Sequence, residues 1–326
     1  MECEKNRERA ENLKKAVFRI EKLVEKFEPI KNADLVKICR ASGIELVSRS
    51  NESHLIHELL ETAINQNIVK NFNRTNLTQK EAQSETLERL SLLLKNCPPQ
   101  SWRGEEQVRL QQFSTPPTVA YVLAKILNPL PEETILEPSA GTGSLAAWLK
   151  IAGCSLQLNE ISGMRRTLLE LQGYKPSGVN AEFLDELLPE EITPDGVLMN
   201  PPFSASGGRT RTGDSNFGFR HVKSALERMK KGGRLVALLG CDALTKTDKG
   251  LRFLNEIALD YDLKAVINLP KSAFYKYGTT FPTAIICIEK NDTKQSPISR
   301  AKYLKDILKA DCQNLEDVLN FTSVFN

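Results

Sequence analysis

The stretch from residue 195 to residue 203, DGVLMNPPF, restricts the possible folds of this chain more than any other. Its apolar part, residues 197–199, is typical of a buried strand, and it ends in Asn200-Pro201-Pro202-Phe203. Consecutive prolines lack backbone N–H groups and restrict φ, so neither a strand nor a helix continues through them. The sequence therefore predicts a stiff bracket at the carboxyl end of a buried strand, where open α/β sheets bind their ligands.

The functional groups of this bracket limit the chemistry that it can perform. Asn200 contributes a carboxamide, the prolines contribute carbonyl groups, and Phe203 contributes an aromatic ring. The bracket contains no nucleophile, metal ligand or titrating group, but it can accept hydrogen bonds from an amino group and stack on a flat ring. A strand end followed by a core phenylalanine is the alternative interpretation, which the bracket alone leaves open.

Composition narrows the class of protein only moderately. A chain of 326 residues is long enough for two domains or for one large α/β domain with an appendage. The net charge of +3 is too small to indicate a polyanionic partner by itself. Because no stretch resembles a signal peptide or a membrane span, we expect a cytoplasmic protein with no membrane partner.

Cysteine and histidine spacing argues against a metal centre. The seven cysteines contain no CxxC pair, which suits a reducing compartment and disfavours a zinc cluster or a disulfide framework. His54 and His57 would share a helix face, but no acidic or thiol partner has a recognisable spacing. We therefore expect no metal.

The first part of the chain, residues 1–99, is expected to form an all-helical region that ends near Cys97-Pro98-Pro99. Apolar residues recur there at three- and four-residue steps, which predicts amphipathic helices. The helical patterns cover residues 13–27, 32–41, 55–64 and 87–94.

Strands and helices alternate over residues 100–290, which predicts an α/β domain. The expected strands are residues 134–137, 155–158, 178–183, 195–199, 234–239, 264–269 and 283–288. Only about a dozen residues join the last two, which is short for a parallel crossover, so we expect them to pair antiparallel. Residues 291–326 are expected to form a helical tail, with one amphipathic helix that carries Leu304, Ile307, Leu308, Leu315, Val318 and Leu319.

A glycine-rich turn follows the expected strand at residues 134–137. Gly141 and Gly143 let the backbone turn tightly and approach a ligand closely. The string GTGSLA also fits the G-x-G-x-x-A pattern of dinucleotide sites, but Glu137 lies just before it and would repel a pyrophosphate. Glu160, after the next strand, is placed to accept hydrogen bonds from ribose hydroxyls. This charge pattern favours a nucleoside that bears a cationic amino acid over a dinucleotide.

The segment QQFSTPP, residues 111–117, predicts the start of a helix. Thr115 precedes two prolines, which are favoured in the first turn. The first N–H groups of a helix lack intrahelical partners, so this start can hold a carboxylate. An ordinary N-cap is the alternative, which this segment alone leaves open.

Taken in order, the segments QQFSTPP, EPSAGTG, Glu160, AEF, NPPF and GTTFPTAIICIEK resemble N6-adenine DNA methyltransferases whose cofactor motifs all precede the catalytic motif. They are particularly similar to modification subunits of type I restriction systems and to related phage and plasmid adenine methylases. The resemblance covers about residues 110–290. It implies an α/β, Rossmann-like S-adenosylmethionine-dependent methyltransferase fold, with a mostly parallel seven-stranded sheet whose last strand is antiparallel. It also implies S-adenosylmethionine as the cofactor.

The resemblance assigns roles to individual residues. Residues 112–117 and the glycine-rich turn would hold the methionine part of the cofactor, Glu160 its ribose, and residues 182 and 183 its adenine. Glu182 stands where the family more often has Asp, and the longer side chain is expected to shift that contact. The expected cofactor-binding residues are Gln112, Phe113, Ser114, Thr115, Pro116, Glu137, Pro138, Ser139, Ala140, Gly141, Thr142, Gly143, Glu160, Glu182, Phe183 and Asn200.

The resemblance also implies a mechanism, with Asn200, Pro201, Pro202 and Phe203 as the expected catalytic residues. The Asn200 side-chain oxygen and the Pro201 carbonyl would accept the N–H bonds of an adenine amino group and localise its lone pair. Phe203 would stack on the base after it has been flipped out of the duplex. Transfer would be direct, with no covalent enzyme intermediate.

The segment after Phe203 is rich in glycine and basic residues. We expect Arg209, Arg211, Arg220 and Lys223 to contact DNA phosphates, with a solvated charged surface as the alternative. The sequence shows no separate target-recognition domain. Either a partner such as a specificity or restriction subunit reads the DNA, or recognition is loose, or the chain is one portion of a larger assembly.

Three functional hypotheses remain open at this point. The first is DNA adenine-N6 methylation. The second keeps the bracket but changes the acceptor, because similar NPP[YF] motifs serve the methylation of RNA bases and of protein glutamine. The third is a non-catalytic subunit that binds cofactor or a partner through its helical region.

Overall fold

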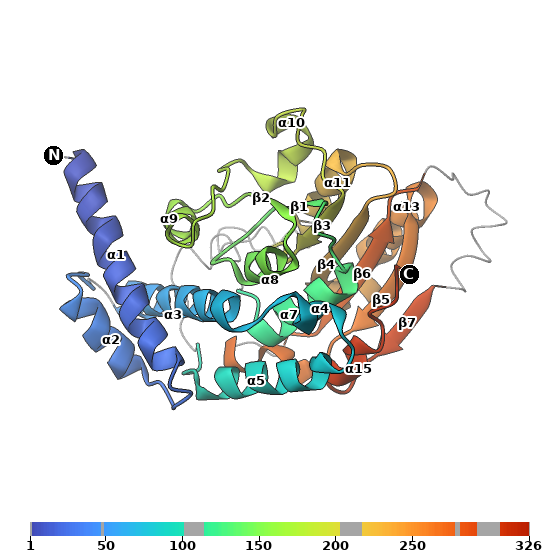
Figure 1. Ribbon diagram of the computed structural model, residues 1–326. Coiled ribbons are helices and arrows are strands. Elements are labelled where there is room, and N and C mark those ends of the chain that lie inside the picture. The colour runs from blue at the N-terminus through green and yellow to red at the C-terminus, as the bar shows by residue number, and fades with distance from the viewer. Residues whose placement is uncertain are drawn as a thin grey trace.

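The computed structural model describes residues 2–46, 49–100, 114–202, 217–277, 281–291 and 307–325. Figure 1 shows a group of helices on one side and a sheet flanked by helices on the other. The first group consists of α1 (Glu2–Val24), α2 (Asn32–Ala41), α3 (Arg49–Asn71), α4 (Arg74–Thr78) and α5 (Ala82–Asn96). Helices thus form where the apolar periodicity predicts them.

The helical region shares its hydrophobic core with the rest of the molecule. The apolar stripe of α1 is buried, and its members are Leu13, Ala16, Val17, Ile20 and Val24. Phe72, at the end of α3, packs on Trp148 of α8 (Ser144–Ala152), with ring centroids 5.5 Å apart. Because one continuous cluster of buried side chains includes both regions, the helices pack directly on the α/β domain.

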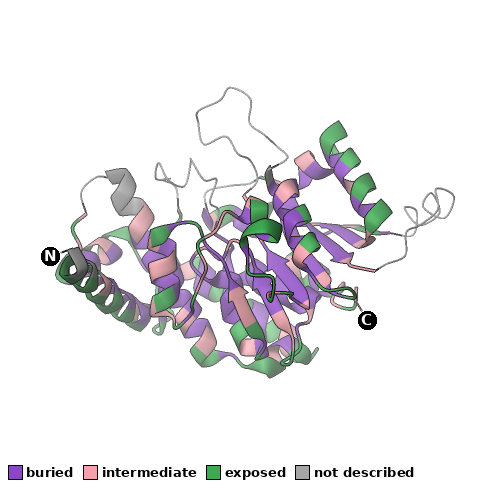
Figure 2. Cartoon of the chain, turned by 90° about the horizontal axis from the view of Figure 1, so that it is seen from above, coloured by how far each residue is buried: buried purple, intermediate pink, exposed green. Residues whose placement is uncertain are grey.

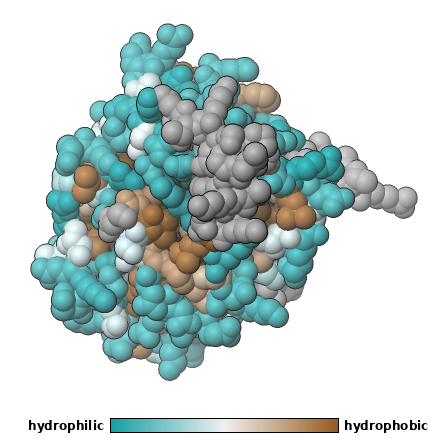
Figure 3. Space-filling model, turned by 90° about the vertical axis from the view of Figure 1, so that its right-hand side faces the viewer, coloured by the Kyte–Doolittle hydropathy of each residue, from teal (hydrophilic) through white to brown (hydrophobic). Residues whose placement is uncertain are grey.

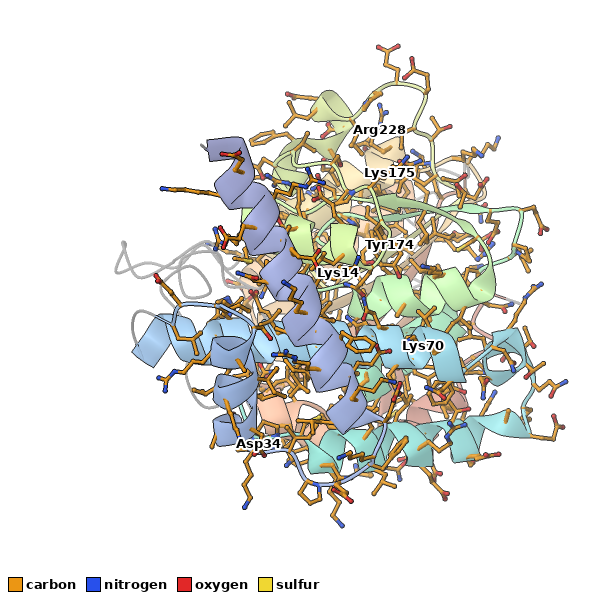
Figure 4. All side chains as sticks on the ribbon, turned by 60° about the vertical axis from the view of Figure 1, so that its left-hand side comes forward. Lys14, Asp34, Lys70, Tyr174, Lys175 and Arg228 are labelled. Atoms are coloured by element: carbon orange, nitrogen blue, oxygen red, sulfur yellow. The ribbon has the colours of Figure 1, made fainter. Side chains whose placement is uncertain are left out.

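Polar contacts also join the two regions. A groove of about 340 Å³ between them is lined by residues that include Lys14 of α1, Lys70 of α3 and Tyr174, all labelled in Figure 4. Lys70 forms an ion pair with the buried Glu21 of α1. The Lys150 ammonium at the end of α8 lies 5.1 Å from the centroid of the Tyr174 ring. Basic side chains in this groove are therefore partly engaged within the protein.

The described part of the chain contains a seven-stranded sheet in the order β2-β1-β3-β4-β6-β5-β7. Its strands are β1 (Thr134–Glu137), β2 (Ser155–Leu158), β3 (Gly196–Met199), β4 (Arg234–Gly240), β5 (Asp262–Asn268), β6 (Thr283–Glu289) and β7 (Leu308–Asp311). β6 runs antiparallel to both β4 and β5, and the remaining pairs are parallel. The mostly parallel sheet and the antiparallel pairing of β5 with β6 are confirmed.

One expected strand is wrong. Residues 178–183 do not form a strand but a loop and the 3-10 helix η1 (Ala181–Phe183). Their backbone N–H groups bond to side chains instead of to a ladder: Val179 N donates to Asn159 Oδ1 over 2.9 Å, and Glu182 N donates to Asn180 Oδ1 over 3.1 Å. Asparagine side chains compete with regular structure in this way.

The expected amphipathic helix of the tail is also wrong for Leu308, while Leu304 lies outside the described residues. Residues 308–311 form β7, which pairs in parallel with β5 and supplies the seventh strand. Among the described residues of the tail, α15 (Leu315–Leu319) is helical, and Asn314 caps it by accepting from Asp317 N over 2.8 Å. The cap starts a new helix at this point, so the apolar residues before and after it belong to different elements.

Helices cover both faces of the sheet. Val236 and Leu238 of β4 pack in the core beneath α7 (Pro117–Leu127), α8 and the helical region. Leu235 and Ala237 face the opposite core, beneath α11 (Phe217–Arg228) and α13 (Asp248–Asp260). Figure 2 shows that the central strands are buried, as expected when helices cover both faces. On the side that Figure 3 shows, hydrophilic side chains surround a smaller hydrophobic area.

The remaining helices are short or lie at the ends of strands. They are α9 (Gly163–Leu171), α10 (Leu184–Leu187), α12 (Cys241–Thr245) and the 3-10 helix η2 (Lys271–Tyr277). Of these, α9 comes after β2 and lies against the glycine-rich turn, so it contributes to the candidate site.

Candidate functional site

Three parallel strands end at the same edge of the sheet, and a predicted site residue stands at each end. β1 ends with Glu137, β2 is closely followed by Glu160, and β3 is followed by Asn200. β1 pairs in parallel with both β2 and β3, so their carboxyl ends lie side by side. The fold thus brings the two carboxylates and the Asn-Pro-Pro bracket together, as the sequence predicts.

The glycine-rich turn between β1 and α8 has the conformation that its glycines permit. Gly141 and Gly143 have φ values of 56° and 95°, in the left-handed region that other residues rarely adopt. Gly141 N donates to Glu160 Oε2 over 2.8 Å, and Ser162 N donates to Glu160 Oε1 over 2.8 Å. Glu160 therefore links the turn to the end of β2. Each of its oxygens has two lone pairs and can accept a further hydrogen bond.

Glu137 lies buried beneath this turn, with 1% of its surface exposed. Its Oε2 atom has no hydrogen-bond partner among the described residues. Burial raises the pKa of Glu137 well above its ordinary value, and the neighbouring carboxylate of Glu160 raises it further. A cationic group placed here would satisfy the carboxylate, so the site fits the ammonium of an amino acid.

The bracket is connected to the start of α7. Asn200 Nδ2 donates to Thr115 Oγ1 over 3.0 Å, and both Ser114 and Thr115 are buried. Pro117 is the first residue of α7, as the sequence predicts. The predicted helix start and the bracket are thus parts of one site. Gln112, Phe113 and Phe203 lie outside the described residues.

The residues expected to hold the cofactor's adenine lie in η1. Phe183 is 43% exposed, and Glu182 forms an ion pair with Arg220 of α11. Lys223, also on α11, forms an exposed ion pair with Glu256 of α13. Two of the predicted phosphate-binding residues therefore pair with carboxylates of the protein itself. The other two, Arg209 and Arg211, lie outside the described residues.

Sequence reasoning missed the basic residues of α13. A cavity of about 320 Å³ lies between α11 and α13, and Lys249 and Arg252 line it together with Arg220 and Lys223. Lys249 and Arg252 are three positions apart and therefore share a helix face, a signal that the sequence does contain. The sequence does not show that α13 packs beside α11, because this contact forms only in the tertiary fold. There Phe219 of α11 stacks on Phe253 of α13, with 4.3 Å between the ring centroids.

Sequence reasoning also missed the contribution of α3. Glu61 and Asn65 bond to Thr142 in the glycine-rich turn, and Glu58 forms a buried ion pair with Arg165 of α9. Burial alone would raise the pKa of Glu58, but Arg165 and His54 outweigh it and hold that pKa at about 2. Periodicity assigns these residues to a helix, but it does not identify what the helix contacts.

The described residues show neither a membrane-spanning helix nor a group of side chains that could hold a metal ion. Among the described helices, none combines the length and the apolar character that a membrane span requires. No group of three His, Cys, Asp or Glu side chains in the described ranges is arranged to hold a metal ion. His54 Nε2 lies 3.1 Å from Glu58 Oε1, so this histidine belongs to the polar network of α3.

Proteins of known structure share this arrangement of strands and helices. No protein-family model matches the chain. A solved structure from Listeria monocytogenes, assigned to the class I S-adenosylmethionine-dependent methyltransferases, is 18% identical with a TM-score of 0.51, and the match covers 97% of this chain and 99% of that one. The type IIG restriction endonuclease BpuSI is 13% identical with a TM-score of 0.50, and the match covers 97% of this chain and 40% of that one.

A third structure comes from Vibrio vulnificus and is assigned as the modification subunit of a type I restriction enzyme. It is 16% identical with a TM-score of 0.48, and the match covers 78% of this chain and 53% of that one. This chain therefore spans about half the length of that subunit. Identities this low show similarity of fold alone. Type I restriction-modification methyltransferase subunits are thus among the structural neighbours. The order of the strands and the match to the Listeria structure show that the chain has the Rossmann-like fold of the S-adenosylmethionine-dependent methyltransferases.

Proposed function

We propose that this protein is an S-adenosylmethionine-dependent DNA methyltransferase that acts on the N6 amino group of adenine. The observation that carries the proposal is the position of Asn200, which stands at the end of β3 beside the glycine-rich turn and is bonded to Thr115. An amide oxygen and a prolyl carbonyl at this strand end, with the buried Glu137 at the end of the adjacent strand β1, support transfer of a methyl group to an amino group.

The residues at the strand ends fit S-adenosylmethionine. Glu137 would pair with the ammonium of its methionine part, because a buried carboxylate oxygen without a hydrogen-bond partner requires a donor. Glu160 would accept from the ribose hydroxyls through its remaining lone pairs. Glu182 and Phe183 would contact the adenine. When bound, the cofactor supplies an electrophilic methyl group on a sulfonium.

The bracket would activate the acceptor. The amino group of adenine is a poor nucleophile because its lone pair is delocalised into the ring. If Asn200 Oδ1 and the Pro201 carbonyl accept its two N–H bonds, the lone pair becomes localised on nitrogen and can attack the methyl group. The nitrogen–methyl bond would form as the sulfur–methyl bond broke, and the amino group would then lose a proton to solvent. Phe203 would stack on the flipped base.

The basic cavity supports nucleic acid as the substrate. Arg220 and Lys223 lie on α11, which follows the segment after the bracket, and Lys249 and Arg252 extend this basic surface onto α13. Phosphates would replace Glu182 and Glu256 as partners of the α11 cations. We further propose that the protein acts in the cytoplasm within a restriction-modification or mobile-element system. A specificity or restriction subunit would be its partner.

A methyl-transfer assay tests the proposal. The full chain is incubated with tritium-labelled S-adenosylmethionine and, separately, with adenine-containing duplex DNA, tRNA or a protein extract. We expect label in the N6-methyladenine of DNA. Asn200→Ala should lose nearly all of this activity while it binds the cofactor with little change. Label in tRNA or protein alone would refute DNA as substrate, and an active Asn200→Ala variant would refute the role of the bracket.

A measurement in cells complements this assay. Methylation-aware sequencing of host DNA, with and without this chain, should reveal N6-methyladenine at a defined sequence only when the chain is expressed. Host DNA that carries the same methylation in both cases would argue against the proposed function.

A further inference from the structure

Helix α3 of the N-terminal region reaches into the glycine-rich turn. Thr142 Oγ1 donates to Glu61 Oε2 over 2.9 Å, and Asn65 Nδ2 donates to the backbone oxygen of Thr142 over 2.9 Å. All three residues are at least 97% buried. The side chain and the main chain of one turn residue are therefore both bonded to a helix that lies more than 70 positions earlier in the chain.

The same part of the turn is held from other sides. Gln172, which follows α9, donates its Nε2 to the Thr142 backbone oxygen over 2.8 Å. Gly143 N donates to Ala140 O over 2.8 Å. The peptide group between Thr142 and Gly143 thus has its carbonyl and its N–H both bonded, so its orientation is determined. Asn65 contributes one of the two bonds to that carbonyl.

A buried ion pair lies next to these contacts. Arg165 Nε of α9 lies 2.6 Å from Glu58 Oε1 of α3, and both side chains are only 4% exposed. A Cβ atom on Gly141 would lie 3.7 Å from Arg165 Nη1, so this guanidinium lies beside the turn. Breaking a buried ion pair leaves an uncompensated charge, so this pair keeps α3 packed on α9, which lies beside the turn. Gln100 adds a bond to Glu61 Oε1 over 2.7 Å, which uses both carboxylate oxygens of Glu61.

We propose that α3 is one wall of the cofactor site and that Glu61 and Asn65 are positioning residues for the turn of residues 140–143. The inference rests on the proposed function, since it assumes that this turn binds S-adenosylmethionine. Neither residue needs to touch the cofactor. Each bonds to Thr142, so the turn has the same shape before and after the cofactor binds. Binding then costs less conformational entropy, because the turn does not have to be ordered. The helical region is then required for cofactor affinity.

Substitutions at Thr142 and Asn65 test this role. Thr142→Val replaces the donating hydroxyl with a methyl group of similar size, and Thr142→Ser keeps the hydroxyl. Asn65→Leu removes the bond to the Thr142 carbonyl. Loss of one buried hydrogen bond should weaken S-adenosylmethionine binding by about fivefold to tenfold in Thr142→Val and Asn65→Leu, measured by calorimetry. Thr142→Ser should stay within about twofold of wild type on the same scale.

A control on the same helix separates positioning from loss of stability. Ile64 is buried in α3 between the two positioning residues, and Ile64→Val removes one methyl group without touching Thr142. It should lower the melting temperature without weakening cofactor binding. At saturating cofactor, kcat on DNA should change little in Asn65→Leu, while the KM for the cofactor should rise.

The outcomes distinguish this inference from the function on which it rests. If wild-type protein does not bind S-adenosylmethionine, the proposed function fails. If wild type binds but Thr142→Val binds equally well, the positioning role is wrong. The same conclusion follows if Ile64→Val weakens binding as much as Asn65→Leu. Should Asn65→Leu fail to fold, the comparison of Thr142→Val with Thr142→Ser measures the same contact from the side of the turn.

Discussion

The side chains of Thr115 and Asn200 form a hydrogen bond of 3.0 Å although 85 positions separate them in the chain. Asn200 donates through Nδ2, so the oxygen of its planar carboxamide points away from Thr115. This bond connects the segment before α7 to the end of β3. It helps to orient the side chain on which the proposed chemistry depends, and this role can be tested.

Replacing Thr115 with Val should lower kcat for methyl transfer to DNA by about fivefold, because one hydrogen bond of about 1 kcal/mol no longer orients Asn200. The dissociation constant of S-adenosylmethionine should change less than kcat does. Thr115→Ser keeps the hydroxyl and should retain most activity. Equal kcat in the Val and Ser variants would show that Asn200 does not depend on this bond.

Cofactor choice can be tested by thermal unfolding. S-adenosylmethionine, but not NAD, should raise the melting temperature, because a ligand that binds only the native state at 100 times its Kd adds about 2.7 kcal/mol to the unfolding free energy. Glu160→Ala should reduce this shift, since it removes the proposed acceptor for the ribose hydroxyls and the observed acceptor for Gly141 N.

The matched control for this measurement is Glu170→Ala, which removes an exposed carboxylate from the neighbouring helix α9. It should leave the shift with S-adenosylmethionine unchanged. Stabilisation by NAD alone would favour the dinucleotide interpretation of the glycine-rich turn.

The raised pKa of Glu137 predicts a pH dependence of binding. Burial raises this pKa, and Glu160 raises it further. Above about pH 4.5, the Glu137 carboxyl therefore keeps its proton in the native state but loses it in the unfolded state. The unfolding free energy of the free protein should therefore fall as pH rises from that value through the raised pKa. A bound ammonium favours the carboxylate, so cofactor binding should release a proton and strengthen with rising pH in this window.

Calorimetry in buffers of different ionisation enthalpy measures that proton release directly. Glu137→Gln should bind the cofactor more weakly and without the pH dependence, because its carboxamide does not titrate. Binding by wild type that neither releases a proton nor varies with pH would show that the cofactor's ammonium does not meet Glu137.

The basic residues after the bracket and those of α13 predict how DNA binding depends on salt. Replacing Arg209, Arg211 and Arg220 with Ala should flatten the plot of log affinity against log salt by roughly two to three units, at about 0.9 per phosphate contact. Replacing Lys249 and Arg252 of α13 should flatten it by roughly two units for the same reason. The loss should be equal for target and non-target duplexes, because phosphate contacts carry no sequence information.

Lys22 and Lys26, both exposed at the end of α1 and just beyond it, provide a control with the same change in charge as the α13 pair. Their replacement by Ala should leave the slope unchanged. An unchanged slope in the variants of the basic surface would identify it as solvated surface. A loss limited to one sequence would indicate that these residues contact bases.

The sequence by itself was sufficient for features that depend on local stereochemistry and periodicity. The sequence predicts the Pro-Pro bracket at the end of a buried strand, the helix start before Pro117, and a tight turn at Gly141 and Gly143. Backbone restrictions of proline and glycine act within a few residues, so one sequence shows them. The edge of the sheet that carries Glu137 then followed from the alternation of strands and helices.

Only the tertiary structure decided which distant residues meet. Residues 178–183 have the composition of a strand, yet Asn159 takes their backbone groups, and residues 308–311 supply the seventh strand instead. Periodicity placed Glu61 on a helix but not against Thr142. These outcomes depend on which segments pack together across long separations, because a backbone group or a carboxylate is satisfied only by a partner that the whole fold brings within hydrogen-bond distance.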